Sequence, residues 1–397
     1  MTSATPIFAL RTGFVYQKPS FSRRDNFVTP PDVTPLKPLT QAQKKNEQEV
    51  QTNQAILKWP GGKARELEKI LEQLPASYEN FYDPFVGGGS CYLNITAQKY
   101  FINDKCEELM GLFEILKTAP EAFISKLKEF DDIWQQAAGF VAANKDSIIS
   151  LYNERKGEEL VALICTLKLF DESFSRELEK RVADKFKRIS KINLQNLSTT
   201  EDVLLNTESA IKSAIYNYIR NQVNDVQLPK LQFLAYYYII RNLAYSGMFR
   251  YNSDGKFNVP YGGIGYNSKV FSSKADYFLS EPVQSKLQAS EFSSLDFEEF
   301  FAANEPTEND FIFLDPPYDT EFSTYSKNKF AREDHKRLAD YLSRTKAKWL
   351  LVIKQTDFIN ELYEGKGYNI STFDKKYVVN FKNRNNRESQ HLLIRNY

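Results

Sequence analysis

The stretch Asp310–Tyr318, with the sequence DFIFLDPPY, constrains the fold more than any other part of this chain. Its apolar run Phe311–Leu314 is short and bulky and is ended by two prolines, which is typical of a buried strand at the edge of a sheet. In an open α/β sheet, ligands bind at the carboxyl ends of the strands, and Asp315 and Tyr318 fall there. They bring a carboxylate, a turn without amide donors and an aromatic plane. These groups suit an amino group on a flat base, although a solvated aspartate after a Pro-Pro strand end is the plainer interpretation.

The composition bounds the class of protein. The chain has 397 residues, which favours two or three domains, and its net charge of +1 neither supports nor excludes a nucleic-acid partner. Three cysteines at unrelated spacings suit a reducing compartment, and two histidines do not suggest a zinc cluster. No apolar run is long enough to cross a bilayer, and the N-terminus lacks a signal-peptide pattern. We therefore expect a soluble cytoplasmic protein with no metal and no membrane partner.

A second strand end lies upstream, in Asn80–Ser90, whose sequence is NFYDPFVGGGS. A strand, a glycine loop and an apolar helix, here expected over residues 91–95, form the nucleotide-binding arrangement. The spacing is neither that of a dinucleotide fingerprint nor that of a P-loop, and Asp83 would repel phosphate but would suit an ammonium group. The next strand, Tyr100–Ile102, leads to Asp104, about 20 residues past the glycine loop, where a carboxylate can accept both hydroxyls of a ribose.

A further glycine-containing segment, Lys58–Lys63 (KWPGGK), precedes an amphipathic helix expected over Ala64–Leu74. Gly61 and Gly62 allow the backbone to approach a ligand closely, and Lys63 falls near a helix N-terminus, which is a natural anion site. An ordinary glycine turn before a helix explains the same residues.

The regions around these motifs differ in composition. Residues 1–54 combine a proline cluster with a polar tract, which predicts a flexible arm. Residues 113–264 show apolar positions at helical spacing and end in Met248–Tyr261, which predicts a β-hairpin with an Asp-Gly turn. A two-stranded ribbon fits the major groove of DNA, so its polar side chains could reach bases or phosphates. These side chains are Arg250, Asn252, Lys256 and Asn258. We expect a helical target-recognition insertion, with a structural or oligomerisation role as the alternative.

The C-terminal third supplies further strands, expected at residues 287–289, 349–353, 368–373, 377–381 and 392–395, with an antiparallel hairpin at the end. The catalytic domain would then comprise residues 55–112 and 265–397. A cationic, amide-rich turn lies between the last two strands, and its side chains Lys382, Arg384 and Arg387 are candidates for phosphate contacts. A solvated turn has the same composition.

Six motifs occur in a fixed order: KWPGGK (58–63), DPFVGGGS (83–90), IND (102–104), GKFNVPYGG (255–263), DF (296–297) and DPPY (315–318). In this order they resemble the motifs of the Dam-type (class alpha) DNA adenine-N6 methyltransferases, which use S-adenosylmethionine. The similarity covers residues 56–110 and 231–397. It implies an α/β, Rossmann-like methyltransferase sheet, mostly parallel with a C-terminal antiparallel hairpin, plus the helical insertion. It also implies site-specific methylation of an adenine flipped out of double-stranded DNA, in restriction–modification with a possible cognate restriction endonuclease.

The resemblance assigns roles to individual residues. Asp315 and the carbonyl of Pro316 would hold the two protons of the adenine amine, while Tyr318 would stack on the flipped base. Asp296 would accept from the adenine amine of the cofactor, and Phe297 would pack on its ring. The complete set of implied cofactor contacts is Trp59, Lys63, Asp83, Phe85, Gly87, Asp104, Asp296, Phe297 and Asp315.

Other functions fit parts of the same sequence. An RNA or other amine methyltransferase could use the same scaffold, and a DNA-binding regulator could retain a vestigial cofactor site, although Asp315 and Tyr318 are both intact. Methylation of cytosine at carbon 5 would need a cysteine after a proline, and none of the three cysteines has one. The ribbon tip is Ser253-Asp254, whereas GATC-reading relatives typically carry Leu-Arg there, so a GATC target is not implied.

Overall fold

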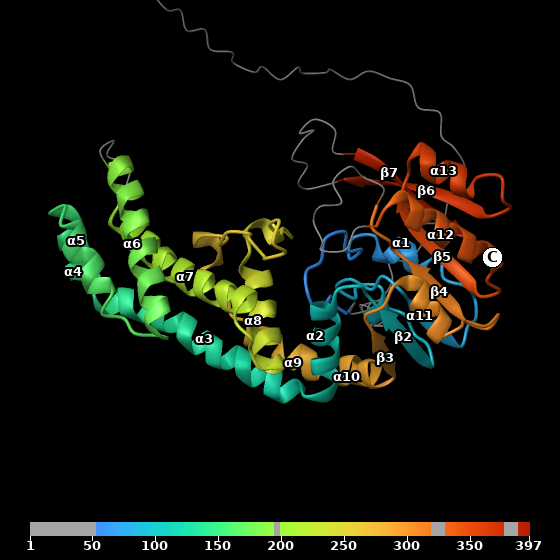
Figure 1. The fold of residues 1–397 in the computed structure, drawn as a ribbon, viewed down its shortest axis with the longest axis horizontal. Helices are drawn as coiled ribbons and strands as arrows, with labels where there is room; N and C mark the ends of the chain where they lie inside the picture. Colours follow the sequence, from blue (N-terminus) through green and yellow to red (C-terminus); the bar gives the residue numbers. More distant parts are fainter. Residues whose placement is uncertain (1–52, 194–198, 319–329, 377–387) are drawn as a thin grey trace, which may run out of the picture. The chain divides into compact units, whose positions relative to one another are not determined.

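A computed structural model describes residues 53–193, 199–318, 330–376 and 388–397 (Figure 1). Most of the predicted arm, the strand expected at residues 377–381 and the cationic turn with Lys382, Arg384 and Arg387 lie outside the described residues. In the part that is described, no helix is long and apolar enough to span a bilayer.

The strand-end motifs lie along a seven-stranded sheet with the order β3-β2-β1-β4-β5-β7-β6. Its strands are β1 Asn80–Asp83, β2 Lys99–Asn103, β3 Ser290–Ser293, β4 Phe311–Leu314, β5 Lys348–Lys354, β6 Asn369–Lys376 and β7 Glu388–Arg395. Strands β3, β2, β1, β4 and β5 run parallel, and β7 lies antiparallel between β5 and β6. The predicted fold class, a mostly parallel sheet with a C-terminal antiparallel hairpin, is confirmed.

Both faces of the sheet are buried at β4 and β5, which explains why β4 is apolar throughout and β5 is apolar between its terminal lysines. Successive side chains of a strand point to opposite faces. Accordingly, Phe311 and Phe313 belong to one buried cluster, while Ile312 and Leu314 belong to the other. Helices α11 (Phe297–Ala303) and α12 (Arg332–Arg344) add Phe300 and Leu338, among others, to the second cluster.

The described helices are α1 Leu67–Leu71, α2 Glu107–Thr118, α3 Pro120–Ala143, α4 Lys145–Asn153, α5 Gly157–Ile164, α6 Glu172–Asn193, α7 Thr200–Asp225, α8 Lys230–Leu243, α9 Ala275–Leu279, α10 Glu281–Gln288, α11 Phe297–Ala303, α12 Arg332–Arg344 and α13 Asp357–Tyr363. Helices α3 to α8 account for the helical periodicity predicted within residues 113–264. Two of them begin as sequence rules expect, because α3 has Pro120 in its first turn and Thr199 and Asp202 form a capping box at the start of α7.

Three local predictions are wrong. The helix expected over Ala64–Leu74 spans only Leu67–Leu71. The helix expected over residues 91–95 is a single 3-10 turn, Tyr92–Asn94. Here the Asn94 side chain donates to the carbonyls of Asn53 (2.9 Å) and Ser90 (2.8 Å), which holds the segment in a turn. Residues 287–289 close α10 instead of forming a strand.

The predicted hairpin is less regular than a two-stranded ribbon. Its described contacts include isolated bridges between Ala244 and Tyr261 and between Tyr251 and Phe257. The amide of Asn252 donates to the carbonyl of Lys256 at 2.9 Å, which closes the turn. We call residues 244–261 the ribbon below.

Candidate active site

The topology of the sheet indicates which of its edges is the candidate site. Strands β1 and β4 are parallel neighbours. The strands that follow β1 lie on one side of this pair and those that follow β4 lie on the other, so the strand order reverses here. Ligands bind at the carboxyl ends of the strands at such a switch point. Asp83 ends β1, and Asp315 follows β4 directly. Asp104 follows β2 in the same way. The sheet therefore brings the three predicted carboxylates to one edge.

Lys63 connects this edge to the DPPY segment. Its ammonium forms an ion pair with Asp315 Oδ1 and donates to the Tyr318 hydroxyl at 2.9 Å and to the Gly61 carbonyl at 3.0 Å. The Lys63 side chain is 2% exposed and that of Asp315 18%. Because a buried ammonium needs a partner, Asp315 compensates a charge that the fold places out of water. Tyr318 also packs edge-on against the buried ring of His391, with centroids 5.3 Å apart.

Asp83 is the most deeply buried of the three carboxylates. Burial raises its pKa well above the usual range, and the nearby charges of Asp315 and Asp104 raise it further. The Phe85 amide, which donates to Oδ1 at 3.1 Å, and the Lys63 ammonium lower it. An excess of carboxylates over ammonium groups favours a positively charged ligand at this edge.

Asp104 holds the glycine loop in place. The amide of Gly87 donates to its Oδ2 at 3.1 Å and the amide of Cys106 donates to its Oδ1 at 3.0 Å. Burial raises the pKa of Asp104 to about 6, against the lowering effect of these two amides. Each carboxylate oxygen can accept a further hydrogen bond, so the predicted ribose contact is compatible with this geometry.

Asn103 is a structural residue of the site to which the sequence analysis gave no role. Its side-chain amide donates to the carbonyls of Pro84 (3.1 Å) and Leu295 (3.0 Å). Its Oδ1 accepts from the Leu295 amide and the Ser293 hydroxyl, both at 2.8 Å. One buried side chain thus ties the loops after β1 and β3 to the end of β2. A polar residue that ends an apolar strand was the available signal.

The glycine loop must lack side chains because other residues occupy that space. A Cβ atom at Gly88 would lie 2.2 Å from the Leu57 carbonyl oxygen, and one at Gly87 would lie 2.8 Å from Cδ1 of Trp59. Gly87 also has a left-handed φ of +52°. The ring of Trp59 contacts Phe249 of the ribbon, with centroids 4.4 Å apart.

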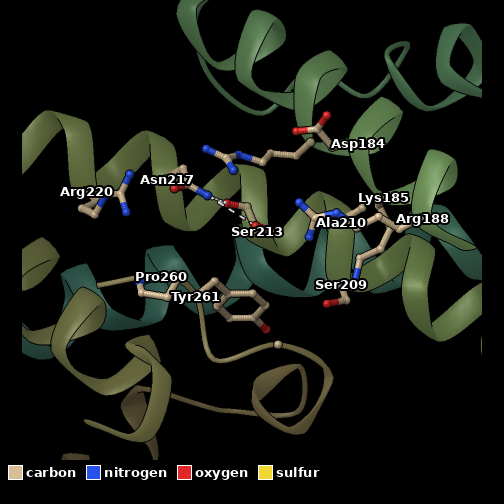
Figure 2. Close-up of a pocket in the computed structure, with 12 residues that line it drawn as sticks. Asp184, Lys185, Arg188, Ser209, Ala210, Ser213, Asn217, Arg220, Pro260 and Tyr261 are labelled. Carbon is tan, nitrogen blue, oxygen red and sulfur yellow. Dashed lines mark hydrogen bonds between the residues drawn. The ribbon is translucent and has the colours of Figure 1, made fainter. Parts of the chain in front are cut away.

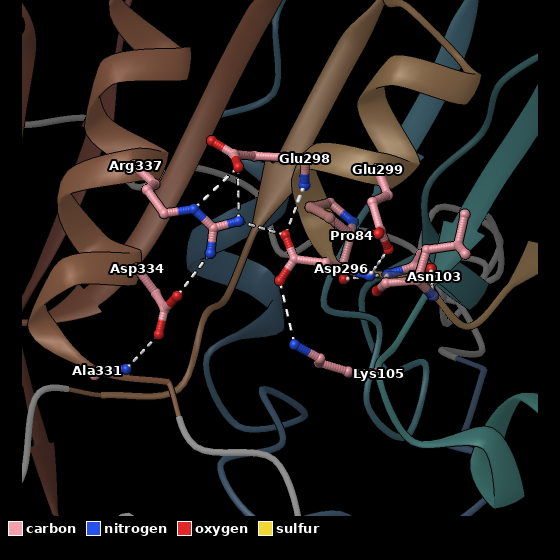
Figure 3. Close-up of polar contacts among 10 residues, drawn as sticks. Pro84, Asn103, Lys105, Asp296, Glu298, Glu299, Ala331, Asp334 and Arg337 are labelled. Carbon is pink, nitrogen blue, oxygen red and sulfur yellow. Dashed lines mark hydrogen bonds and ion pairs between the residues drawn. The ribbon is translucent and has the colours of Figure 1, made fainter.

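A small pocket of about 50 Å³ lies beside the glycine loop and includes Phe85, Asp296, Phe297 and Pro317 among its lining residues. The carboxylate of Asp296 accepts from Arg337 at 2.6 Å and from Lys105 at 3.2 Å, as Figure 3 shows. Burial acts to raise the pKa of Asp296, but the hydrogen bond from Arg337 and other donors leave it below the usual value. The predicted contact with the cofactor's adenine amine would share an oxygen with these donors.

The ribbon residues that are predicted to bind DNA make contacts with one another or with α7. Arg250 Nε donates to Asn258 Oδ1 at 2.9 Å. Asn252 Oδ1 accepts from the amides of Asp254 (3.1 Å) and Lys256 (2.9 Å), so this side chain closes the turn. The Lys256 ammonium pairs with Asp225 at the end of α7.

Fold and site together define a class: an α/β protein with a glycine loop and a DPPY segment at the switch point of its sheet. The chain matches the family described as D12 class N6 adenine-specific DNA methyltransferase over residues 59–379, and it belongs to that family. It is thus an adenine-specific DNA methyltransferase, an enzyme of a family that acts on DNA and uses S-adenosylmethionine.

The relatives include a DNA adenine methylase and Type II methyltransferases. The chain is 34% identical over 199 residues to the Type II methyltransferase M.CviBI of Paramecium bursaria Chlorella virus NC1A, covering 46% of this chain and 72% of the relative. It is 25% identical over 340 residues to the DNA adenine methylase of Vibrio cholerae, covering 83% and 92%. It is 26% identical over 363 residues to the Type II methyltransferase M.MjaIII of Methanocaldococcus jannaschii, covering 86% and 98%.

Proposed function

We propose that Asp315, Pro316 and Tyr318 are the catalytic residues of site-specific adenine methylation. The observation that carries this assignment is the ion pair between Lys63 and Asp315 at the carboxyl end of β4. It fixes the orientation of a carboxylate in a setting where the neighbouring Pro316 offers a carbonyl but no competing amide donor.

These residues suit the chemistry of a weakly nucleophilic amine. The lone pair of the adenine amine is delocalised into the ring. Acceptors at Asp315 and Pro316 hold its two protons, bias the nitrogen toward tetrahedral geometry and stabilise the positive charge that develops on it. Tyr318 supplies the plane on which a base extruded from the duplex stacks. When bound, S-adenosylmethionine supplies an activated methyl group on a sulfonium, so the protein contributes alignment and electrostatics.

The residues at the sheet edge fit S-adenosylmethionine. Its methionine part carries an ammonium and its sulfonium is cationic, which suits Asp83 and the neighbouring carboxylates. The backbone of the glycine loop is held at this edge, because the amide of Gly87 donates to Asp104 Oδ2 at 3.1 Å. We assign the binding residues as Trp59, Lys63, Asp83, Phe85, Gly87, Asp104, Asp296, Phe297 and Asp315. In this assignment Asp104 accepts from the ribose, and Asp296 and Phe297 hold the adenine.

Recognition of the DNA sequence is assigned to residues 113–264, with residues 55–112 and 265–397 as the catalytic domain. The ribbon supports this because its Phe249 touches Trp59 beside the glycine loop. Arg250, Asn252, Lys256 and Asn258 are the candidate contacts in the ribbon, and Lys382, Arg384 and Arg387 are further candidates. We also propose a restriction–modification setting with a cognate endonuclease, because two of the relatives are named Type II methyltransferases.

The assignment of Asp315 is tested with the variant Asp315→Ala. Loss of this hydrogen-bond acceptor is expected to lower the rate of N6-methyladenine formation on mixed-sequence duplex DNA by about 100- to 1,000-fold, as for loss of a preorganised transition-state contact. Binding of duplex DNA is expected to persist. The exposed Asp340 on α12 gives the matched control Asp340→Ala, which should behave as wild type.

A rate for Asp315→Ala within tenfold of wild type would contradict the assignment. Offering single-stranded RNA beside duplex DNA to the wild-type protein distinguishes the RNA alternative, and sequencing DNA from expressing cells maps the methylated adenines and hence the target site.

A further inference from the structure

A basic cleft of about 470 Å³ lies between α6, α7 and residues 260–263 (Figure 2). Four cationic side chains line it, and the single acidic side chain among its lining residues is Asp184. The four are Arg181, Lys185, Arg188 and Arg220. Helices α6 and α7 carry none of the six motifs, and residues 260–263 are the end of the motif GKFNVPYGG. None of the residues assigned to catalysis or to cofactor binding lines the cleft.

Three of the cations share one face of α6. Arg181, Lys185 and Arg188 are spaced four and then three residues apart, which places them in a row along a helix. At roughly 1.5 Å of rise per residue the row is about 10 Å long. One strand of B-DNA carries a phosphate about every 3.4 Å along the axis, so the row spans roughly three phosphates. A single free phosphate would reach only part of it.

The positive charge of the row is only partly compensated by its protein contacts. Arg181 donates to the Glu177 carboxylate at 2.5 Å, whereas Lys185 donates to the neutral amide oxygen of Asn206 at 3.3 Å. Burial lowers the pKa of Lys185, and the neighbouring Arg188 lowers it further. An anion bound between these side chains would relieve that repulsion.

The far wall of the cleft connects it to the ribbon. Arg220 on α7 donates to the Val259 carbonyl at 3.1 Å, and Asn224 donates to the Phe257 carbonyl at 2.9 Å. The amide of Phe257 in turn donates to Asn224 Oδ1 at 2.9 Å. The ribbon and the cleft are therefore held on the same helix, so a polyanion that lies along one can continue into the other.

We propose that the cleft binds consecutive phosphates of one strand of the DNA duplex, beside the base pairs that the ribbon reaches. The proposal rests on the proposed function, in which the ribbon contacts duplex DNA. Its contribution is independent of base sequence, because phosphate contacts fix position and register and do not read bases.

The test compares the full-length protein with the double variant Lys185→Gln/Arg188→Gln. Each phosphate contact contributes about 0.9 to the slope of the logarithm of the binding constant against the logarithm of salt concentration. The double variant is expected to reduce that slope by about two on any mixed-sequence duplex, measured by fluorescence anisotropy across a salt series.

The matched control is Lys180→Gln/Lys187→Gln, which removes the same charge from exposed positions of α6 outside the cleft. Circular dichroism establishes that both variants are folded. A slope equal to wild type, or an equal loss in the control, would overturn the proposal. The proposal would also be overturned if the double variant kept the wild-type slope but was no longer stabilised by inorganic phosphate against thermal unfolding. The cleft would then be a site for a small anion. Failure of the wild-type protein to bind any duplex would instead refute the proposed function itself.

Discussion

Three carboxyl groups and the Lys63 ammonium meet at the carboxyl ends of β1, β2 and β4. Asp83 and Asp104 are held by backbone amides, yet burial raises the pKa of both. Keeping them ionised costs free energy in the folded protein, and the Lys63 ammonium offsets part of that cost at Asp83. A cationic ligand would offset more of it, which is the physical reason that this edge suits a sulfonium and an ammonium.

The residue whose titration can be followed is Asp104, because its pKa is raised to about 6. A raised carboxyl pKa means that the folded state favours the neutral form, so the stability contributed by Asp104 is lost as pH rises through 6. In Asp104→Asn this dependence is absent. The free energy of unfolding of wild type relative to the variant should therefore fall between about pH 4 and pH 6.5 in thermal unfolding experiments and stay constant above that range. Parallel curves for the two proteins would contradict the raised pKa.

The same substitution tests the ribose contact in the proposed cofactor site. A hydrogen bond to a charged acceptor contributes about 1.5–3 kcal/mol, so Asp104→Asn is expected to weaken S-adenosylmethionine binding about 10- to 100-fold at pH 8. Isothermal titration calorimetry measures it. Glu107→Gln, at an exposed position three residues away in the first turn of α2, removes the same charge and is the comparison for a general charge effect. An affinity equal to wild type would exclude Asp104 from the site.

At the scale of elements, the glycine loop is shaped by its neighbours more than by backbone freedom. Gly88 has an unstrained backbone, but its Cβ would collide with a carbonyl of the segment that leads into the fold. Gly255 at the ribbon tip presents the opposite case, since it has a φ of +72° and no atom within 4 Å of its Cβ position. Gly88 is therefore required because a side chain would collide with its neighbours, whereas Gly255 is required because of its left-handed backbone conformation.

Alanine substitutions at these two glycines should therefore differ. Gly255→Ala is expected to cost about 1 kcal/mol from the left-handed conformation alone. Gly88→Ala is expected to cost about 2–3 kcal/mol, because the backbone of Leu57 must move, and to weaken cofactor binding as well. Urea unfolding gives both values. A smaller cost at Gly88 than at Gly255 would show that the loop accommodates a side chain.

At the scale of the whole molecule, contacts divide the chain between Gln51 and Thr52. The segment just after this division is firmly attached. The Ile56 amide donates to the Gly88 carbonyl at 3.0 Å, and Ile56 and Leu57 are each 1% exposed. The glycine loop is thus supported by residues that precede the first motif.

Two truncations test this division. Removal of residues 1–51 is expected to leave the unfolding temperature and the methylation rate within error of the full-length protein. Removal of residues 1–57 also deletes Ile56 and Leu57, whose burial contributes roughly 3–6 kcal/mol together, so the unfolding temperature should fall markedly. Equal unfolding temperatures for the two truncations would show that the segment does not support the core.

The sequence by itself determined the sheet, the order of its motifs and the positions of Asp83, Asp104 and Asp315 at strand ends. An apolar run that is ended by proline, glycine or a polar residue is a local signal for a strand. The carboxylate that follows such a strand must then lie at the carboxyl-end edge of the sheet. Local signals were insufficient where two conformations compete over a few residues. The turn at Tyr92–Asn94 and the placement of β3 at Ser290–Ser293 are the examples.

Only the tertiary structure decided which distant groups meet. Lys63 and Asp315 are 252 positions apart, and no periodicity relates them. The spacing of Arg181, Lys185 and Arg188 predicts an ordinary solvated helix face, and it becomes a cleft only because α7 and residues 260–263 pack opposite it. Periodicity fixes which face of a helix or strand is polar and which is apolar. The packing of the whole chain decides which other element lies against each face.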